Sequence, residues 1–442
     1  MNDESNGQRS LRPFIILWTG QSISLIGSQL VQFALIWWMT QQTGSATVLA
    51  IASVIGLLPQ VFLGPFAGVM VDRWNRRLVM LGADLTVALA TLGLAVMFWT
   101  GSAEIWHVYV ALFIRSLGGA FHWPAMTAST SLMVPKEQLT RVQGLNQILN
   151  GGLNVASAPL GALLVTLLPV EGVLLIDLLT ASIAIALLLL IQIPQPKQAV
   201  ADGSQSSISA YWTDLRDGMH YLVSWRGLFY LALTAMLLNM VLSPTTSFMP
   251  LLVTNHFSGT AWHLGILEGG FGVGILIGGL LLGVWGGFKR QIMTSVIGVA
   301  GIGVGVLIVG SAPASMFPLA VGGMLMGGVM SSLTNGPIMA IFQAKVAPEM
   351  QGRVFTLMGS LTTGMMPISL VVAGPLADVI GVRTWFIGSG LFTLAMAICI
   401  LFMPSLMNLE AERDDYVEGE DKKEAISSQL SLGSPLDSAE GV

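Results

Sequence analysis

Four ionisable residues, Asp84, Arg115, Asp177 and Glu268, lie inside long apolar stretches of the chain. Burial in apolar surroundings favours the neutral form of a carboxyl group, whereas an arginine keeps its charge. Acids placed in this way can bind and release a proton, so they suggest proton exchange rather than covalent catalysis. Glu268 ranks first as a proton carrier, because the two glycines that follow it leave room for water or a cationic ligand.

The other three groups also have structural interpretations. Asp84 ranks second as a proton carrier, because its depth also suits a bond to Arg77 or to a linker residue. Arg115 needs a carboxylate, backbone oxygens or water around it, and its partner either holds an exchangeable proton or forms a static ion pair. Asp177 either carries a proton or fixes the packing of its helix.

Polar and aromatic side chains in the same stretches predict a pocket for an amphipathic ligand. Asn146, Asn150 and Asn154 recur every fourth residue and share one helix face, which either lines a cavity or bonds helices together. His122 could titrate or serve only in packing. The predicted pocket residues are Gln21, Gln29, Gln32, Trp37, His122, Asn146, Asn150, Asn154, Asn239, Phe271, Asn335, Met358 and Met365.

The elements that must position these side chains are membrane-spanning helices. Of the 442 residues, 53% are hydrophobic and 10% are charged, whereas a soluble domain carries about a quarter charged residues. Twelve apolar runs approach or exceed the roughly 20 residues that cross a bilayer. They cover residues 14–39, 46–71, 78–99, 106–133, 142–168, 171–193, 228–252, 262–286, 291–311, 315–342, 354–378 and 383–404.

The grouping of the runs predicts an all-α polytopic membrane protein with two six-helix halves, residues 14–193 and 228–404. Residues 194–227 change to a Pro, Ser, Gln and Gly composition followed by an amphipathic pattern, which indicates a cytoplasmic linker. Residues 1–13 form a cytoplasmic N-terminus. Residues 405–442 form an acidic cytoplasmic tail that is expected to be disordered.

The distribution of basic residues predicts the orientation. All but two of the 19 Lys and Arg residues fall in segments on one side of the predicted spans, the exceptions being Arg115 and Arg383. Because basic residues near span ends stay on the cytoplasmic side, both termini are predicted to be cytoplasmic. The expected location is the inner (plasma) membrane of the cell.

The two halves also carry an internal repeat. Pro124 and Pro337 have the same separation as Arg76 and Lys289. Repeated six-helix units in parallel orientation are typical of transporter folds. The repeat predicts that the loops bearing Arg76 and Lys289 lie on one face of the membrane.

Several other classes are excluded or not expected. The single Cys399 cannot build a disulfide framework or a thiolate zinc site. The chain has no Gly-Lys dipeptide, so it has no Walker loop and ATP does not drive transport within it. The net charge of −5 gives no sign of nucleic-acid binding. We find no cluster of nucleophile, base and metal ligands, so we expect no enzyme, cofactor or metal site.

The segment from Gly68 to Arg77 reads GVMVDRWNRR and resembles the signature loop of the major facilitator superfamily, with Asn75 replacing its second glycine. In that family the acid, here Asp72, docks against the start of the eleventh spanning helix, here residues 351–354. The glycine would let neighbouring helices approach closely. The resemblance assigns a gating motif to Gly68, Asp72, Arg73, Arg76 and Arg77.

Two further segments resemble the drug:proton antiporter branch of that family. Residues 115–119, RSLGG, resemble its R-x-x-q-G element, with Gly118 where glutamine is usual. Residues 158–162, APLGA, resemble its G-P-x-x-G-G element loosely. Residues 11–404 as a whole are similar to bacterial macrolide-efflux proteins.

This resemblance implies a monomer in the lipid bilayer that exports an amphipathic drug-like compound, such as a macrolide, by alternating access coupled to proton entry. Exporters of siderophores and movers of lysolipids share the fold and stay open as alternatives. A non-transporting receptor or a membrane enzyme would be of a different class. A receptor would leave the gating acid and the buried charges without a purpose.

Overall fold

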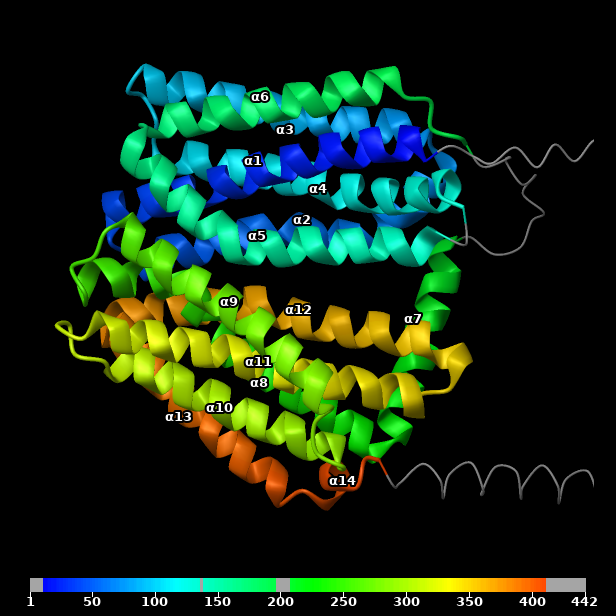
Figure 1. Cartoon of the computed structure of the whole chain (residues 1–442), viewed down its shortest axis with the longest axis vertical. Coiled ribbons are helices and arrows are strands. Elements are labelled where there is room, and N and C mark those ends of the chain that lie inside the picture. Colours follow the sequence, from blue (N-terminus) through cyan, green and yellow to red (C-terminus); the bar gives the residue numbers. More distant parts are fainter. Residues whose placement is uncertain (1–10, 136–137, 196–206, 411–442) are drawn as a thin grey trace, which may run out of the picture.

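The computed structural model describes residues 11–135, 138–195 and 207–410, which form α-helices and no strands (Figure 1). The predicted N-terminal segment up to residue 10, residues 196–206 of the linker and the tail from residue 411 lie outside the described residues. The helices are α1 Arg12–Thr43, α2 Ala46–Arg73, α3 Arg76–Trp99, α4 Ile105–Met133, α5 Leu139–Leu167, α6 Val170–Leu190, α7 Ser207–Ser224, α8 Arg226–Asn255, α9 Ala261–Trp285, α10 Gln291–Ser311, α11 Phe317–Lys345, α12 Pro348–Ile380, α13 Val382–Leu401 and α14 Pro404–Met407.

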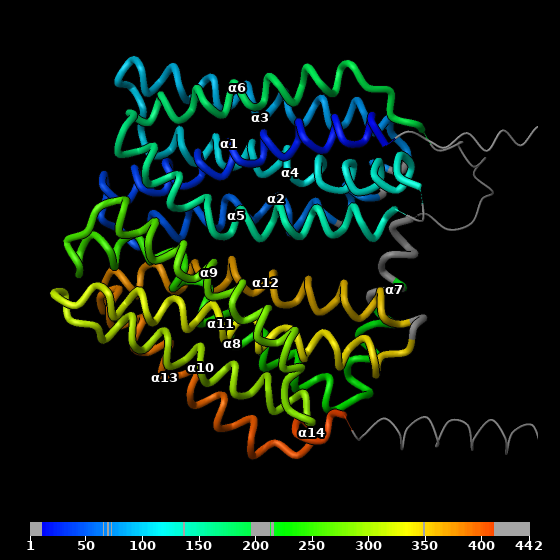
Figure 2. Tube along the Cα trace, in the orientation of Figure 1, coloured from blue at the N-terminus to red at the C-terminus, as the bar shows by residue number. Residues whose placement is uncertain are grey.

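Two helical bundles, α1–α6 and α8–α13, lie side by side (Figures 1 and 2). In the first bundle α1 packs against α5 and α6, and α4 packs against α2 and α3. In the second bundle α10 packs against α11 and α13, and α11 also packs against α9. The predicted all-α fold with two six-helix halves is confirmed.

Eleven of the described helices are long and apolar enough to cross a membrane. The twelfth predicted span is α4, which has 29 residues. Arg115 and His122 lower the hydropathy of α4, which nevertheless packs beside the spanning helices α2 and α3. The chain is therefore a multi-pass membrane protein with twelve long helices.

The ends of the long helices define two faces of the molecule (Figure 1). We call the face with the turns after α1, α3, α5, α8, α10 and α12 the turn face. The opposite face carries α7 and both ends of the described chain, and we call it the linker face. The loops bearing Arg76 and Lys289 both lie on the linker face. Lys289 lies close to the start of α10, where the backbone N–H of Ile292 donates to Glu410 at 2.7 Å.

The short connection between α1 and α2 illustrates how the sequence sets these turns. Gly44 ends α1 with a φ of 60°, a left-handed conformation that glycine adopts without strain. Ser45 begins α2, and its side chain accepts a hydrogen bond from the backbone N–H of Val48. One glycine and one serine therefore reverse the chain between two spanning helices.

The amphipathic helix α7 crosses the linker face and packs against α12 (Figure 1). Asp217 of α7 lies 3.1 Å from the Arg353 guanidinium of α12. Gly218 lies directly against the backbone of Arg353, where a Cβ atom would come within 3.3 Å of the carbonyl oxygen. The linker helix is thus held at the beginning of α12.

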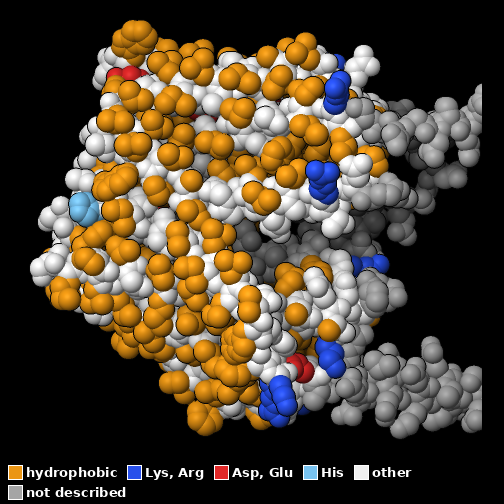
Figure 3. Space-filling view, viewed as in Figure 1, with side chains coloured by type: hydrophobic (Ala, Val, Ile, Leu, Met, Phe, Trp, Pro, Cys, Tyr) orange, Lys and Arg blue, Asp and Glu red, His pale blue; other side chains and the backbone are white. Residues whose placement is uncertain are grey.

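The two bundles contact each other at the turn face and separate toward the linker face. In α9, Gly265 packs against Ala162 of α5, and Gly269 packs against Pro159 of α5. The Ser53 and Ser247 hydroxyls, from α2 and α8, lie 3.0 Å apart. Figure 3 shows a hollow between the bundles on the side of the linker face. The molecule is closed at one face and open at the other.

Candidate functional site

A cavity of about 600 Å³ lies mainly inside the first bundle and reaches the second; we call it the polar cavity, because half of its lining residues are Gln, Ser, Asp, Arg or His. Its walls come from α1, α2, α3 and α4, and Ala181 of α6, Ser247 of α8, and Met366 and Leu370 of α12 complete it. The cavity therefore touches both bundles between the closed turn face and the open linker face.

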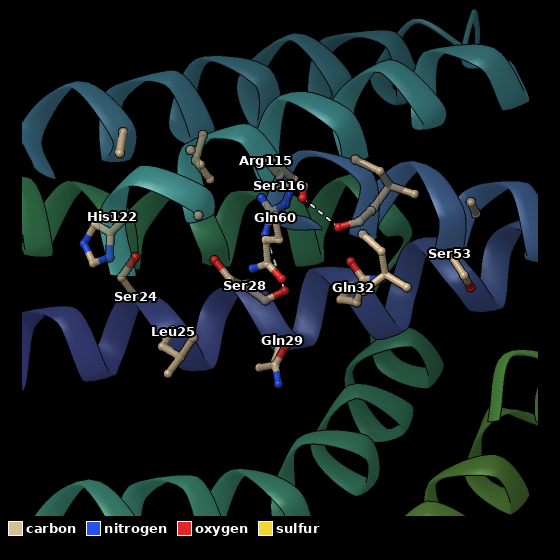
Figure 4. Close-up of a pocket in the computed structure, with 18 of the residues that line it drawn as sticks. Ser24, Leu25, Ser28, Gln29, Gln32, Ser53, Gln60, Arg115, Ser116 and His122 are labelled. Atoms are coloured by element: carbon tan, nitrogen blue, oxygen red, sulfur yellow. Dashed lines mark hydrogen bonds between the residues drawn. The ribbon is translucent and has the colours of Figure 1, made fainter. Parts of the chain in front are cut away.

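A polar stripe along α1 forms one wall of this cavity. Ser24, Ser28, Gln29 and Gln32 lie along α1 in Figure 4, and Gln21 continues the stripe toward the linker face. These positions are three to four residues apart, except for the neighbours Ser28 and Gln29, so they share one side of the helix. The three predicted glutamines therefore line the cavity.

Asp84 of α3 and His122 of α4 meet toward the end of the cavity nearer the linker face. Gln21 donates a hydrogen bond to Asp84 Oδ2 at 2.9 Å. His122 Nε2 lies 3.4 Å from Asp84 Oδ1 and has no hydrogen-bond partner among the described residues. Arg77, which was one of the two structural partners considered for Asp84 beside a linker residue, donates instead to the carbonyl oxygens of Leu188 and Leu189 of α6.

Arg115 and Asp177 form a buried ion pair between α4 and α6. Arg115 Nη1 lies 2.6 Å from Asp177 Oδ2. Thr91 of α3 and Ser28 of α1 each donate a hydrogen bond to the same carboxylate at 3.2 Å. Four helices thus meet at one satisfied charge pair, which favours the structural interpretation of Asp177.

Glu268 lies in a different environment at the contact between the bundles. Glu268 lines a cavity of about 160 Å³ whose walls come from α1, α5 and α9. Gln29 and Gln32 of α1 line both this small cavity and the polar cavity. No described side chain forms an ion pair or a hydrogen bond with the Glu268 carboxyl. Glu268 is therefore a partly buried acid that has no fixed partner among the described residues and lies next to the polar cavity.

The predicted gating motif lies at the linker-face end of α2 and the start of α3. Arg76 is buried and donates to the Ala128 carbonyl oxygen of α4 at 2.9 Å. Arg76 and Arg77 therefore bind backbone oxygens within their own bundle. Gly68 has open space where a Cβ would lie, so it makes no close helix contact here. The Asp72 side chain is outside the described part of the structure, and its docking to α12 stays a prediction.

A second cavity, of about 430 Å³ and mostly apolar, lies inside the second bundle. Asn239, Phe271 and Asn335 line it, as predicted pocket residues. Asn239 and Asn335 each donate to a backbone carbonyl oxygen one turn earlier in their own helix, at 3.0 and 2.9 Å. Met366 lines both the polar cavity and this apolar cavity.

Several predicted pocket residues lie elsewhere. Trp37 and Met358 are buried in hydrophobic clusters and do not line either cavity. The prediction for these two residues is wrong, because a spanning helix is apolar on every side and its sequence does not reveal its inner face. Asn146 accepts a hydrogen bond from the Trp18 indole at 2.7 Å and so joins α1 to α5. The remaining three, Asn150, Asn154 and Met365, line neither cavity.

Sequence reasoning missed several lining residues of the polar cavity. Gln60 of α2 and Ser116 of α4 point into it in Figure 4. A glutamine inside an apolar run carries a usable signal, because a polar amide in lipid needs a partner or water. Serine carries little signal, since its hydroxyl can bond to its own helix. Ser116 instead donates to the Gly56 carbonyl oxygen of α2 at 2.6 Å.

Comparison with known sequences gives one family and several relatives. The sequence profile of the Major Facilitator Superfamily matches residues 17–370. Macrolide efflux protein A of Streptococcus pyogenes is 37% identical over 397 residues, 90% of this chain and 97% of that protein. A protein of the same name from Enterococcus faecalis is 38% identical, covering 74% of this chain and all of that protein. Multidrug efflux pump Tap of Mycobacterium tuberculosis is 26% identical, covering 85% and 89%.

Solved structures support the same architecture. A bacterial homologue of the iron transporter ferroportin, solved in an inward-facing state, superposes with a TM-score of 0.66 at 18% identity, covering 88% of this chain and 99% of that one. A POT family transporter in complex with 5-aminolevulinic acid superposes with a TM-score of 0.68 at 12% identity, covering 90% and 98%. At these identities the likeness concerns the fold alone.

Proposed function

The chain belongs to the major facilitator superfamily of membrane transporters, and from this premise we propose that it exports amphipathic, macrolide-like compounds by proton-coupled alternating access. The two macrolide efflux relatives at 37% and 38% identity support the substrate class. The observation that carries the proposal is the pair of cavities that meet at Met366, one polar and one apolar. An amphipathic ligand offers a surface for each.

We assign the linker face to the cytoplasm of a cell bounded by this plasma membrane. Arg73, Arg76, Arg77, Lys289 and Arg290 all lie near the linker-face ends of spanning helices. Basic residues at such positions stay on the cytoplasmic side. In this orientation the open cavity faces the cytoplasm, so the molecule is in an inward-facing state that is ready to take up a compound for export.

Proton coupling is assigned first to Glu268. A charged carboxylate without a cation inside the bilayer costs several kcal/mol, so the acid is neutral when the bundles are closed around it. The acid can ionise when α5 and α9 part, or when water reaches it past Gln29 and Gln32. Proton binding at Glu268 therefore favours closure of the turn face, and this links the proton to the direction of transport.

Asp84 with His122 is the second candidate for the proton. The two side chains lie 3.4 Å apart inside the polar cavity, which is open to the linker face. A proton shared by this pair would exchange with the cytoplasm in the present state. Arg115 and Asp177 are assigned to a static ion pair that joins α4 to α6.

The test is an accumulation and resistance assay in a host that lacks its own efflux pumps. Cells that express the chain should accumulate several-fold less macrolide than cells without it, and collapse of the proton gradient should restore the accumulation. Dyes, siderophores and lysolipids are measured in parallel. Export of one of these compounds with no effect on macrolides would contradict the substrate class. Export that survives loss of the gradient would contradict proton coupling.

A further inference from the structure

The Asp378 side chain at the turn-face end of α12 binds the beginning of α2, which belongs to the other bundle. Asp378 Oδ1 accepts the backbone N–H of Ala46 at 2.6 Å, and Oδ2 accepts the backbone N–H of Thr47 at 3.1 Å. Oδ2 also accepts the hydroxyl groups of Ser45 at 2.9 Å and Thr47 at 2.6 Å. One carboxylate therefore receives four hydrogen bonds across the contact between the bundles.

The chemistry of a helix beginning explains why a carboxylate suits this place. The first N–H groups of a helix have no partner within it, and the helix dipole places partial positive charge there. The Ser45 hydroxyl caps α2 from within, but as an acceptor it binds the backbone N–H of Val48, at 3.4 Å, and not that of Ala46 or Thr47. Asp378 supplies the acceptors for Ala46 and Thr47 that the first bundle lacks. Hydrogen bonds to a charged acceptor are about twice as strong as neutral ones.

Close packing below the carboxylate fixes this register. Gly374 lies one turn before Asp378, and a Cβ there would come within 2.8 Å of the Ala50 side chain and 3.0 Å of the Thr47 backbone. Deeper in the membrane, the Ser53 and Ser247 hydroxyls meet at 3.0 Å. The first turns of α2 are thus fitted against α12 and α8, with Asp378 at the outer end.

We propose that Asp378 is the latch of the turn face: its carboxylate holds α2 to α12 while the cavity is open at the linker face, and it must release α2 before the cavity can open at the turn face. The inference rests on the alternating access of the proposed function. The two helices run in opposite directions, so the turn-face end of α12, which carries Asp378, lies at the beginning of α2. Asp378 is a positioning residue, because it acts on the helices and not on the transported compound.

The test measures access to the cavity from outside the cell without any substrate. A single cysteine is placed in the cavity by Ser53→Cys in a Cys399→Ser background, and its labelling by a membrane-impermeant maleimide is followed. Asp378→Asn keeps the shape of the side chain but removes its charge, and we expect labelling from outside about tenfold faster, the change in equilibrium caused by losing roughly one charge-assisted hydrogen bond. Labelling of a Gln21→Cys probe from the linker face should fall.

Glu104→Gln is the matched control. Glu104 is another exposed acid of the turn face, but its side chain binds Trp106 within its own bundle at 2.8 Å. This variant should label at the parental rate. Equal acceleration in both variants would overturn the latch, because it would indicate a general effect of surface charge. Unchanged labelling in Asp378→Asn would also overturn it.

Thr47→Ala provides a second test in case the aspartate variant does not fold. It removes one of the four bonds and should accelerate labelling by a smaller factor of about three. Parental labelling in a folded Thr47→Ala protein would count against the latch. Because the assay needs no ligand, accelerated labelling together with a failed macrolide assay would overturn only the proposed substrate.

Discussion

At the scale of single residues, the charged groups inside the membrane differ in how completely they are satisfied. Asp177 has Arg115 at 2.6 Å and two hydroxyl donors. Glu268 has no hydrogen bond or ion pair with any described residue, and it lies beside a small cavity. A carboxylate that is bound by an arginine and two hydroxyl groups is fixed in place, whereas an acid without a partner can gain or lose a proton as its surroundings change. The first arrangement suits a structural role and the second suits proton exchange.

We expect Asp177→Asn to destabilise the protein by about 3–5 kcal/mol, because Arg115 would remain buried without its carboxylate. The measurement is the melting temperature of the purified protein in detergent. Ser28→Ala is the control, since it removes only one donor at 3.2 Å and should cost about 1 kcal/mol. A parental melting temperature in the Asp177 variant would show that the pair does not hold the first bundle together.

We expect Glu268→Gln to abolish uphill efflux while ligand binding and downhill exchange persist, because glutamine imitates the neutral acid permanently. Efflux against a gradient and exchange without one are measured in the same vesicles. Asp84→Asn is the comparison variant, since Asp84 is the second candidate for the proton. Normal uphill efflux by Glu268→Gln would transfer the coupling role to Asp84 and His122.

At the scale of helices, glycines of α9 bring the two bundles into contact. A Cβ at Gly272 would come within 2.3 Å of the Asn154 carbonyl oxygen of α5, whereas a Cβ at Gly279 would meet no atom within 4 Å. The two glycines lie two turns apart on nearly the same side of α9, and Gly279 is the nearer of the two to the linker face, where the bundles separate. Helix packing in lipid depends on such small residues, because they let backbones approach closely.

We therefore expect Gly272→Ala to force α5 and α9 apart, with a cost of about 1–3 kcal/mol to the turn-face-closed state. The measurement is the transport rate together with labelling of the Ser53→Cys probe from outside. Gly279→Ala is the matched control and should transport at the parental rate. Equal transport by both variants would show that this contact does not limit the cycle.

The sequence predicted the helices well and their inner faces poorly. The positions of all twelve long helices could be predicted from the apolar runs, because a run of about 20 apolar residues is typical of a helix that crosses a membrane. Gln21, Gln29 and Gln32 were correctly predicted to line the cavity, because they are polar residues within an apolar run. Trp37 and Met358 were misplaced, because lipid-facing and core-facing positions are both apolar. Asp378 was not singled out, because its partner lies in the other bundle.

At the scale of the whole molecule, the contact across the turn face is the feature that must break and re-form in every transport cycle. The Ser53 and Ser247 hydroxyls, 3.0 Å apart, span this contact. Cysteines at both positions would bring two sulfur atoms close enough for a disulfide.

We expect the double variant Ser53→Cys and Ser247→Cys, in a Cys399→Ser background, to stop transporting under oxidising conditions and to recover with reductant. Transport and the formation of the disulfide are measured on the same sample. Each single variant is the control and should keep its transport under oxidation. Transport by the fully cross-linked protein would show that the bundles do not part at the turn face.

The Met366 side chain lines both the polar cavity of about 600 Å³ and the apolar cavity of about 430 Å³. We therefore expect that two small compounds of unlike polarity can bind to the protein together, one in each cavity. Their inhibition of each other's export would be noncompetitive, with a lower maximal rate and an unchanged half-saturating concentration. A compound long enough to pass Met366 would compete with both, so the pattern of mutual inhibition would report the length of a substrate without any structure of its complex.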